Sequence, residues 1–293
     1  MSIIRKSEDL EIIVLRIFED FCKFGGDFYI ISPWIQNFSF SEAISDEYKT
    51  FGTEPSLYVI LRKCSELQPR GTLKIITHNF GLKPKYSPLH IEEKAQRFNV
   101  KININSLKDD GILGSLFEFY LSLLKDYKEY SKFNSPWMLT SFRDFKELVE
   151  DVREEENYTK TVFDLVHGLE QVGFNLQYLN DLRKFLEIEN VKIMLHNNFH
   201  AKIFLAGSSC VTGSSNWTFS GFTKNDEINL FFSETDSPEE MIKIKERCYE
   251  LEHQAIVVNL ENVAFSILLH KYLEFIYSIF FDWLTSNKNK LVK

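Results

Sequence analysis

Apolar residues at the start of the chain first follow a helical spacing and then gather into short uninterrupted runs. Within residues 8–24 the apolar positions are Leu10, Ile13, Val14, Ile17, Phe18 and Phe21. This spacing predicts an amphipathic helix. "FYIISPWI" (28–35) predicts a buried strand ended by Pro33, and a second helix over 56–67 precedes a strand in "TLKIITH" (72–78). Alternation of this kind indicates a layered α/β unit with parallel strands.

The pattern changes between residues 84 and 160, where charged helical patterns such as "LGSLFEFYLSLLKDYKEYSKF" (113–133) dominate. We interpret 84–160 as a helical insertion that divides one α/β unit into residues 1–83 and 161–236. The second part contains a helix near "LNDLRKFLEI" (179–188) and then four strand-like runs, "VKIMLH", "HAKIFLAG", "CVTGSSN" and "EINLFF". Residues 237–293 are expected to form C-terminal helices, with Ser237 as an N-cap and Pro238 in the first turn.

Composition and charge limit the functions that the chain can have. The 293 residues carry a formal net charge of −8, which argues against a surface coated with positive charge for sequence-blind nucleic-acid binding. The 34 Lys and Arg residues still allow a local basic groove. The four cysteines are widely spaced and lack a C-x-x-C pair, so neither a zinc site nor a disulfide framework is indicated.

The most apolar stretch is "NVAFSILLHKYLEFIYSIFFDWLTSN" (262–287). His270, Lys271, Glu274 and Asp282 interrupt it, whereas a membrane-spanning helix needs about 20 nearly uninterrupted apolar residues. We therefore expect a buried or dimer-forming helix and no stable membrane insertion. The N-terminal residues have acids inside their apolar pattern, unlike a signal peptide, so a cytoplasmic protein is expected.

Polar residues cluster around the last strand-like runs. Residues two apart in a strand share a face, so His200 and Lys202 are expected to project together. The next run leads to "GSSN" (213–216), where glycine permits a close backbone turn and Asn216 offers an amide donor. Glu227 precedes the following run and is expected to reach the same end of the sheet.

H-x-K, then G-S-x-N, then an acid before an apolar strand resembles the pattern of the phospholipase D superfamily, often called the HKD family. The resemblance covers residues 191–232 well and residues 27–78 more loosely. H-x-K alone is common by chance, but its combination with "TGSSNWT" and Glu227 is specific. The resemblance implies a phospholipase D-like mixed sheet flanked by helices. One departure is that the family's Asp, five residues after the Lys, is Gly207 here, which implies a lower activity.

The resemblance implies hydrolysis of a phosphodiester through a covalent phosphohistidine, with no metal and no cofactor. His200 would be the nucleophile, and Glu227 would accept a hydrogen bond from its other ring nitrogen. Lys202 and Asn216, with Ser214 adjacent, would hold the phosphate oxygens as charge develops in the transition state.

A second histidine is required to protonate the leaving oxygen, because an alkoxide leaves poorly. The chain has a single H-x-K, so we predict a homodimer in which two His200 side chains meet at one shared site.

Five further residues are predicted to contact the substrate: Ser32, Trp34, His196, Ser215 and Trp217. Trp34 follows a strand at the edge where open α/β sheets bind ligands, so it either stacks on a base or packs against the fold. Trp217 has the same two interpretations. His196, like His78, ends a strand-like run and either lines the site or is a loop histidine without a role.

Single-motif members of the family resemble bacterial nucleases, including those of restriction and phage-defence systems. We therefore favour DNA cleavage, with a helicase or another defence-system subunit supplying DNA binding to this acidic chain. Two alternatives stay open. A lipid hydrolase would use the Phe-rich last helix as an acyl groove, and a catalytically weak interaction subunit is compatible with Gly207.

Overall fold

The computed structural model describes residues 2–4, 7–41, 49–52, 55–78, 82, 153–196, 198–223 and 227–292. The chain divides into two compact units. The first comprises Met1–Asn79 and Asp181–Leu260, and the second comprises Phe80–Asn180 and Glu261–Lys293. Residues 84–152 of the predicted insertion lie outside the described residues. The expected boundary at residue 160 falls inside a single helix, α7 (Glu155–Leu186), and the division between units comes instead at 180/181.

In the part of the chain that the structure describes, the first unit contains an eight-stranded mixed sheet in the order β1-β7-β6-β5-β2-β3-β4-β8. The strands are β1 (Ser2–Ile4), β2 (Phe28–Ile31), β3 (Leu73–Thr77), β4 (Val191–Leu195), β5 (Ile203–Ala206), β6 (Ser209–Gly213), β7 (Asn229–Ser233) and β8 (Ile256–Val257). Neighbours β2, β3 and β4 are parallel, and the other pairs are antiparallel. The predicted α/β class with a mixed sheet is confirmed.

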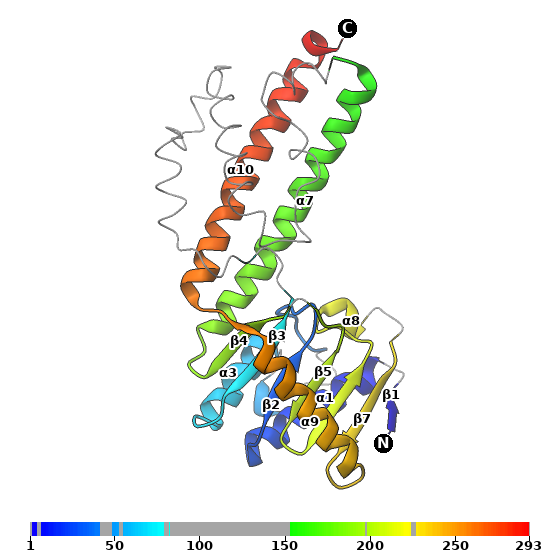
Figure 1. Ribbon diagram of the computed structural model, residues 1–293, viewed down its shortest axis with the longest axis vertical. Coiled ribbons are helices and arrows are strands. Elements are labelled where there is room, and N and C mark those ends of the chain that lie inside the picture. Colours follow the sequence, from blue (N-terminus) through cyan, green and yellow to red (C-terminus); the bar gives the residue numbers. More distant parts are fainter. Residues whose placement is uncertain are drawn as a thin grey trace. The chain divides into compact units, whose positions relative to one another are not determined.

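Helices cover both faces of this sheet (Figure 1). Helices α1 (Ser7–Phe24) and α3 (Leu57–Leu67) lie on one face, and α9 (Pro238–Gln254) lies on the other. Two shorter helices, η1 (Lys49–Phe51) and α8 (Phe219–Thr223), belong to the connections. Ser56 caps α3 by accepting a hydrogen bond from Val59, whereas Ser237, at the predicted N-cap of α9, makes no side-chain capping bond.

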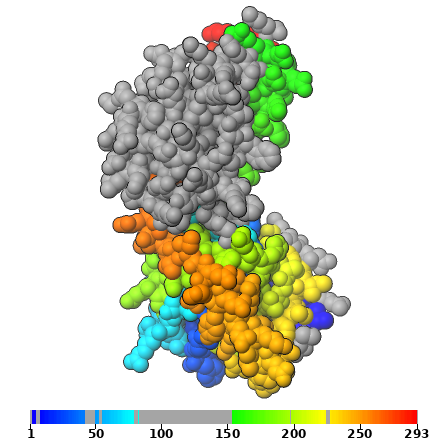
Figure 2. Space-filling view, viewed as in Figure 1, coloured from blue at the N-terminus to red at the C-terminus, as the bar shows by residue number. Residues whose placement is uncertain are grey.

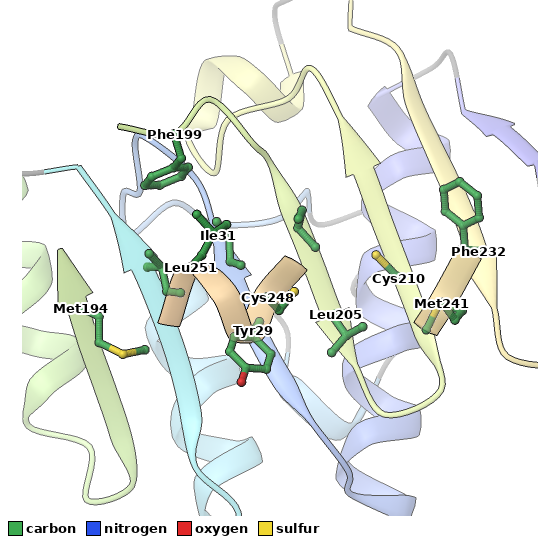
Figure 3. Packing of buried hydrophobic residues seen from close by; sticks show 12 residues of the cluster. Tyr29, Ile31, Met194, Phe199, Leu205, Cys210, Phe232, Met241, Cys248 and Leu251 are labelled. Carbon is green, nitrogen blue, oxygen red and sulfur yellow. The ribbon is translucent and has the colours of Figure 1, made fainter. Parts of the chain in front are cut away.

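Strand alternation explains how both faces are filled, because successive side chains point to opposite sides of a sheet. Phe28 and Phe204 pack against Phe18 of α1, with ring centroids 6.0 and 4.6 Å away. Tyr29 and Leu205, one position along each strand, belong instead to the cluster beneath α9 (Figure 3). Figure 2 shows the outer surface of α9 over this face of the first unit.

A partly buried polar group also joins α9 to the sheet. Glu252 accepts hydrogen bonds from the Tyr29 hydroxyl and from the Lys74 ammonium group, the latter at 2.8 Å. Lys192 lies 3.8 Å from the same carboxylate. Burial by itself would raise the pKa of Glu252, but the hydrogen bonds from Lys74 and Tyr29 outweigh it and the pKa is lowered. The carboxylate is therefore held in its charged form.

The second unit contains most of α7 and of α10 (Leu260–Leu291), which lie side by side (Figure 1). Their shared core includes Leu165, Val172, Phe265, Ile276 and Phe280. His270 is buried among these residues. Its Nδ1 donates to the carbonyl of Ser266 at 2.7 Å, and Asn175 lies 3.3 Å from its Nε2.

Among the described helices, α10 alone is long and apolar enough to cross a membrane by length and composition. Within the structure, 61% of its most apolar 18-residue window is buried. A mostly buried helix of this kind matches the expectation of a core helix, since core helices of globular proteins share the same apolar composition.

Candidate active site

One edge of the sheet gathers the predicted site residues, because β2, β3 and β4 end there while β5 and β7 begin there. The register shows this directly: Ile31 pairs with Ile203, Ile203 with Thr212, and Gly213 with Asn229. Residues that follow β2, β3, β4 and β6, or precede β5 and β7, therefore lie at the same edge. They are Ser32, Trp34, His78, His196, His200, Lys202, Ser214, Ser215, Asn216, Trp217 and Glu227.

His200 and Lys202 form the most direct contact at this edge. They precede β5 in a loop, where the sequence predicted a strand, yet their side chains still meet. The Lys202 Nζ atom lies 2.9 Å from His200 Nδ1 and 3.1 Å from the His200 carbonyl oxygen. His200 is exposed, whereas Lys202 is only 8% exposed. An ammonium group can only donate, so Nδ1 accepts and the neutral ring carries its proton on Nε2.

The environment of Lys202 is unusual for a lysine. Burial lowers its pKa, and the negative charge of Glu227 acts in the opposite direction. Glu227 is thus close enough to influence the ammonium group. The predicted hydrogen bond from His200 to Glu227 stays a prediction, because the contact at Nδ1 comes from Lys202. A buried cation beside an exposed imidazole is an arrangement that suits an anionic ligand.

Asn216 lies beside a fully buried serine, Ser32. The Ser32 hydroxyl donates to the Trp34 carbonyl at 2.7 Å and lies 3.3 Å from Asn216 Oδ1, while the Trp217 N–H donates to the same hydroxyl at 3.2 Å. Ser32 is 0% exposed. The contact of Ser32 with a substrate stays a prediction. In this structure its hydroxyl is enclosed and bonds to the Trp34 carbonyl and the Trp217 N–H.

Two other residues that are predicted to contact the substrate, Trp217 and Ser215, are also buried. Trp217 is 3% exposed. Its ring lies among four aromatic rings, with centroids 4.9–6.4 Å away, from Phe18, Phe38, Phe204 and Phe222. A covered ring offers no face to a base, so Trp217 is a core residue.

Ser215 is likewise buried at 5% exposure, and its hydroxyl accepts a hydrogen bond from the Asn229 side chain at 2.8 Å. Its neighbour Ser214 is exposed, and the Ser214 hydroxyl accepts from the Ile228 N–H at 3.0 Å. Both serines thus brace the junction between β6 and β7. Trp34 is half-buried, and its contact with a substrate stays a prediction.

Two histidine rings lie against Phe199, which is buried at the edge of the cluster beneath α9 (Figure 3). The ring of Phe199 lies edge-on to His78 at 4.7 Å and to His196 at 5.6 Å. His196 Nε2 lies 3.1 Å from Gln254 Oε1, and its Nδ1 accepts from the Asn198 N–H.

His78 is a histidine for which the sequence left two interpretations open, a role in the site or none. Its Nε2 lies 2.6 Å from the Phe199 carbonyl oxygen. Burial lowers the pKa of His78, and the charges of His200, His196 and Lys202 lower it further, although the bond to the carbonyl acts in the opposite direction. The only sequence signal for this position was that His78 follows a parallel strand, at the edge where ligands bind.

Gly207, the position of the family's Asp, lies at the opposite end of β5 from His200, in the turn to β6. Its φ of +59° is in the left-handed region, and a Cβ atom there would lie 2.9 Å from the Gly25 carbonyl oxygen. Its own N–H donates to the Asp27 carbonyl at 2.8 Å. The local backbone therefore requires glycine, and its presence leaves the groups around His200 intact.

Comparison with protein-family models matches residues 136–249 to the family described as "Cardiolipin synthase, PLD-like domain". The match includes His200, Lys202, Asn216 and Glu227 and covers less than half of the chain. It supports membership of the phospholipase D superfamily and a phosphodiesterase type of hydrolase activity. Comparisons with curated proteins and with solved structures gave no match.

Proposed function

We propose that this protein is a metal-independent DNA nuclease that acts through a phosphohistidine. The observation that carries the proposal is the pairing of buried Lys202 with exposed His200 at 2.9 Å, on the sheet edge that also holds Asn216 and Glu227. A buried ammonium group with one N–H beyond its two contacts to His200 supplies a donor for a phosphate oxygen. The oxygen of the Asn216 amide lies 3.3 Å from the Ser32 hydroxyl, and the amide N–H groups are donors for the same ligand.

In the proposed reaction, the phosphodiester draws the Lys202 ammonium group from His200 Nδ1 to a phosphate oxygen. The Nδ1 atom then takes the ring proton and donates it in a hydrogen bond to Glu227, so that Nε2 has a free electron pair. Nε2 attacks phosphorus, an N–P bond forms, and the P–O bond to the leaving group breaks. Water then attacks phosphorus and gives a proton to the histidine that protonated the leaving oxygen. The N–P bond breaks, a phosphate monoester is released and His200 is restored.

The leaving oxygen takes a proton as the P–O bond breaks. In our proposal the donor is His200 of a second copy, so the active form is a homodimer with one shared site. The chain carries a net negative charge, so in our proposal a partner protein supplies the affinity for DNA. By analogy with single-motif nucleases, we favour a helicase-type subunit of a cytoplasmic phage-defence system as this partner.

The test is cleavage of labelled single- and double-stranded DNA in EDTA. We expect wild-type protein to cut DNA and His200→Ala to be inactive. His167→Ala, which removes an exposed histidine of α7, is the matched control and should keep full activity. Denaturing gels of stopped reactions should show a protein–DNA adduct that is acid-labile, as a phosphohistidine is. Full cleavage by His200→Ala would contradict the nucleophile, and a monomer of full activity at micromolar concentration would contradict the shared site.

A lipid phosphodiesterase is the second candidate, and the observation that favours it is the matched family's description as a cardiolipin synthase domain. The same assay panel therefore includes RNA and short-chain phosphatidylcholine. Cleavage of the lipid with DNA left intact would replace the nuclease proposal. If the wild type cleaves none of these diesters, the third candidate, a catalytically weak interaction subunit, takes precedence.

A further inference from the structure

We propose that His78 is a positioning residue that holds the peptide group from which the His200 nucleophile projects. The proposal rests on the proposed function, because it assigns a role in placing the nucleophile of that same site. It extends the site to β3, a strand outside the matched family region of residues 136–249.

The backbone on the β3 side is firmly placed. The His78 N–H donates to the Pro33 carbonyl at 3.3 Å, and the hydroxyl of buried Thr77 donates to the same oxygen at 3.1 Å. These two bonds tie the end of β3 to the chain that leaves β2. The imidazole of His78 therefore projects from a rigid part of the sheet edge.

From this base, His78 reaches the loop before β5. A carbonyl oxygen only accepts, so the 2.6 Å contact means that His78 Nε2 carries a hydrogen and donates it to Phe199. The Phe199 carbonyl belongs to the peptide group whose nitrogen is that of His200. Fixing this carbonyl fixes the plane of that peptide group and hence the direction in which the His200 side chain leaves the backbone.

Phe199 is held at both its side chain and its backbone. Its side chain is 6% exposed and belongs to the cluster beneath α9, together with Ile31 and Leu251 (Figure 3). Its carbonyl is held by His78. A loop residue secured at both its ring and its carbonyl gives the next residue little freedom. His200 is exposed and depends on this backbone, because its own ring has only the contact to Lys202 among the hydrogen bonds of the described residues.

His78 is better suited to positioning than to proton donation. Its Nε2 hydrogen is already committed to a backbone carbonyl, which does not leave in the reaction. Burial lowers the pKa of His78, so the ring is held neutral and adds no positive charge beside His200, His196 and Lys202. A neutral donor positions the nucleophile without discouraging the imidazolium-like charge that develops on His200.

Two substitutions separate the donor from the ring. His78→Phe keeps an aromatic ring against Phe199 but removes the N–H, whereas His78→Gln removes the ring and places an amide N–H near the position of Nε2. We expect His78→Phe to lower kcat by about 10- to 100-fold with KM within about twofold, since a small misplacement of a reacting group is enough for such a loss. His78→Gln should recover most of kcat. Equal losses in both variants would overturn the proposal.

A second measurement does not depend on cleavage. The ¹⁵N resonances of the His200 ring, assigned by their absence in His200→Ala, should shift and broaden in His78→Phe and return toward wild type in His78→Gln. Unchanged His200 resonances in His78→Phe would overturn the positioning role. If the wild-type protein cleaves no diester, the proposed function is contradicted. The spectra then still show whether the contact of His78 with the Phe199 carbonyl positions the His200 ring. Thermal unfolding confirms that each variant is folded, and His78→Met replaces His78→Phe if the latter is not.

Discussion

The ammonium nitrogen of Lys202 lies 2.9 Å from Nδ1 of His200, although one side chain is buried and the other is exposed. The contact places the proton of the neutral imidazole on Nε2, the atom that must attack phosphorus. Lys202 therefore has two roles in the proposed cycle. It holds the imidazole before the phosphate arrives and then moves to a phosphate oxygen as negative charge develops there.

Replacing Lys202 by Met should lower kcat by about 10²- to 10³-fold, the usual effect of removing one donor that stabilises a transition state. Met has a similar length and fits the same buried position without a charge. Lys202→Arg, which keeps the charge, should retain more activity than Lys202→Met. Single-turnover cleavage under saturating DNA measures the effect, and equal rates for wild type and Lys202→Met would exclude Lys202 from the chemical step.

The pH dependence of cleavage should report two opposing effects on the pKa of Lys202, burial of the ammonium group and the negative charge of Glu227. Burial lowers the pKa of Lys202, so the ammonium group is lost at a lower pH than in a free lysine, and activity should fall as the pH rises through this value. Glu227 raises the pKa of Lys202, so Glu227→Gln should move the alkaline limb of the kcat profile to lower pH. A limb that stays in place, or moves to higher pH, would show that Glu227 does not act on Lys202.

Placing the Asp of the phospholipase D pattern at residue 207 should destabilise the protein without increasing its activity. Gly207 has a φ of +59°, and an added Cβ would lie 2.9 Å from the Gly25 carbonyl oxygen. We expect Gly207→Asp to lower the free energy of unfolding by about 1–3 kcal/mol, as strained backbone positions do.

The matched control is Ser208→Asp, which adds the same charge at the exposed neighbouring position of the turn and should change stability little. Urea unfolding followed by circular dichroism gives both values. A Gly207→Asp variant that is as stable as wild type and cleaves faster would mean that the turn accepts the family's residue.

Glu252 should be important for holding α9 against the sheet. Glu252→Ala leaves the Lys74 ammonium group and the Tyr29 hydroxyl without their shared acceptor, and we expect a loss of about 1–3 kcal/mol in unfolding free energy. Glu250→Ala on the same helix removes an exposed pair with Arg247 and should cost less than about 1 kcal/mol.

The pH dependence of the same measurement adds a check. The pKa of Glu252 is lowered in the folded protein, so its contribution is present above the ordinary carboxyl pKa and is lost as the pH falls through the lowered value. The difference in unfolding free energy between wild type and Glu252→Ala should therefore shrink in acid. A difference that is constant from neutral to acidic pH would assign the loss to packing alone.

Local pattern was sufficient for the elements with long apolar runs. The helix over 8–24, the strands at 28–31 and 73–77 and the strands around the H-x-K and G-S-x-N motifs all appear close to their expected positions. β1 and β8 were missed, because strands of three and two residues have no measurable periodicity and form only by pairing with β7 and β4.

The sequence by itself determined which residue types react and in what order they occur. His200, Lys202, Asn216 and Glu227 lie within one short stretch of the chain, at the spacing of the motif. Tertiary structure decided which neighbours contribute. Trp217 and Ser215 are buried, Ser32 is enclosed beneath Asn216, and His78 reaches Phe199 across 121 positions of the chain. Such contacts depend on which strands meet at one edge of the sheet, and that pairing is set by long-range burial of apolar faces rather than by any local pattern.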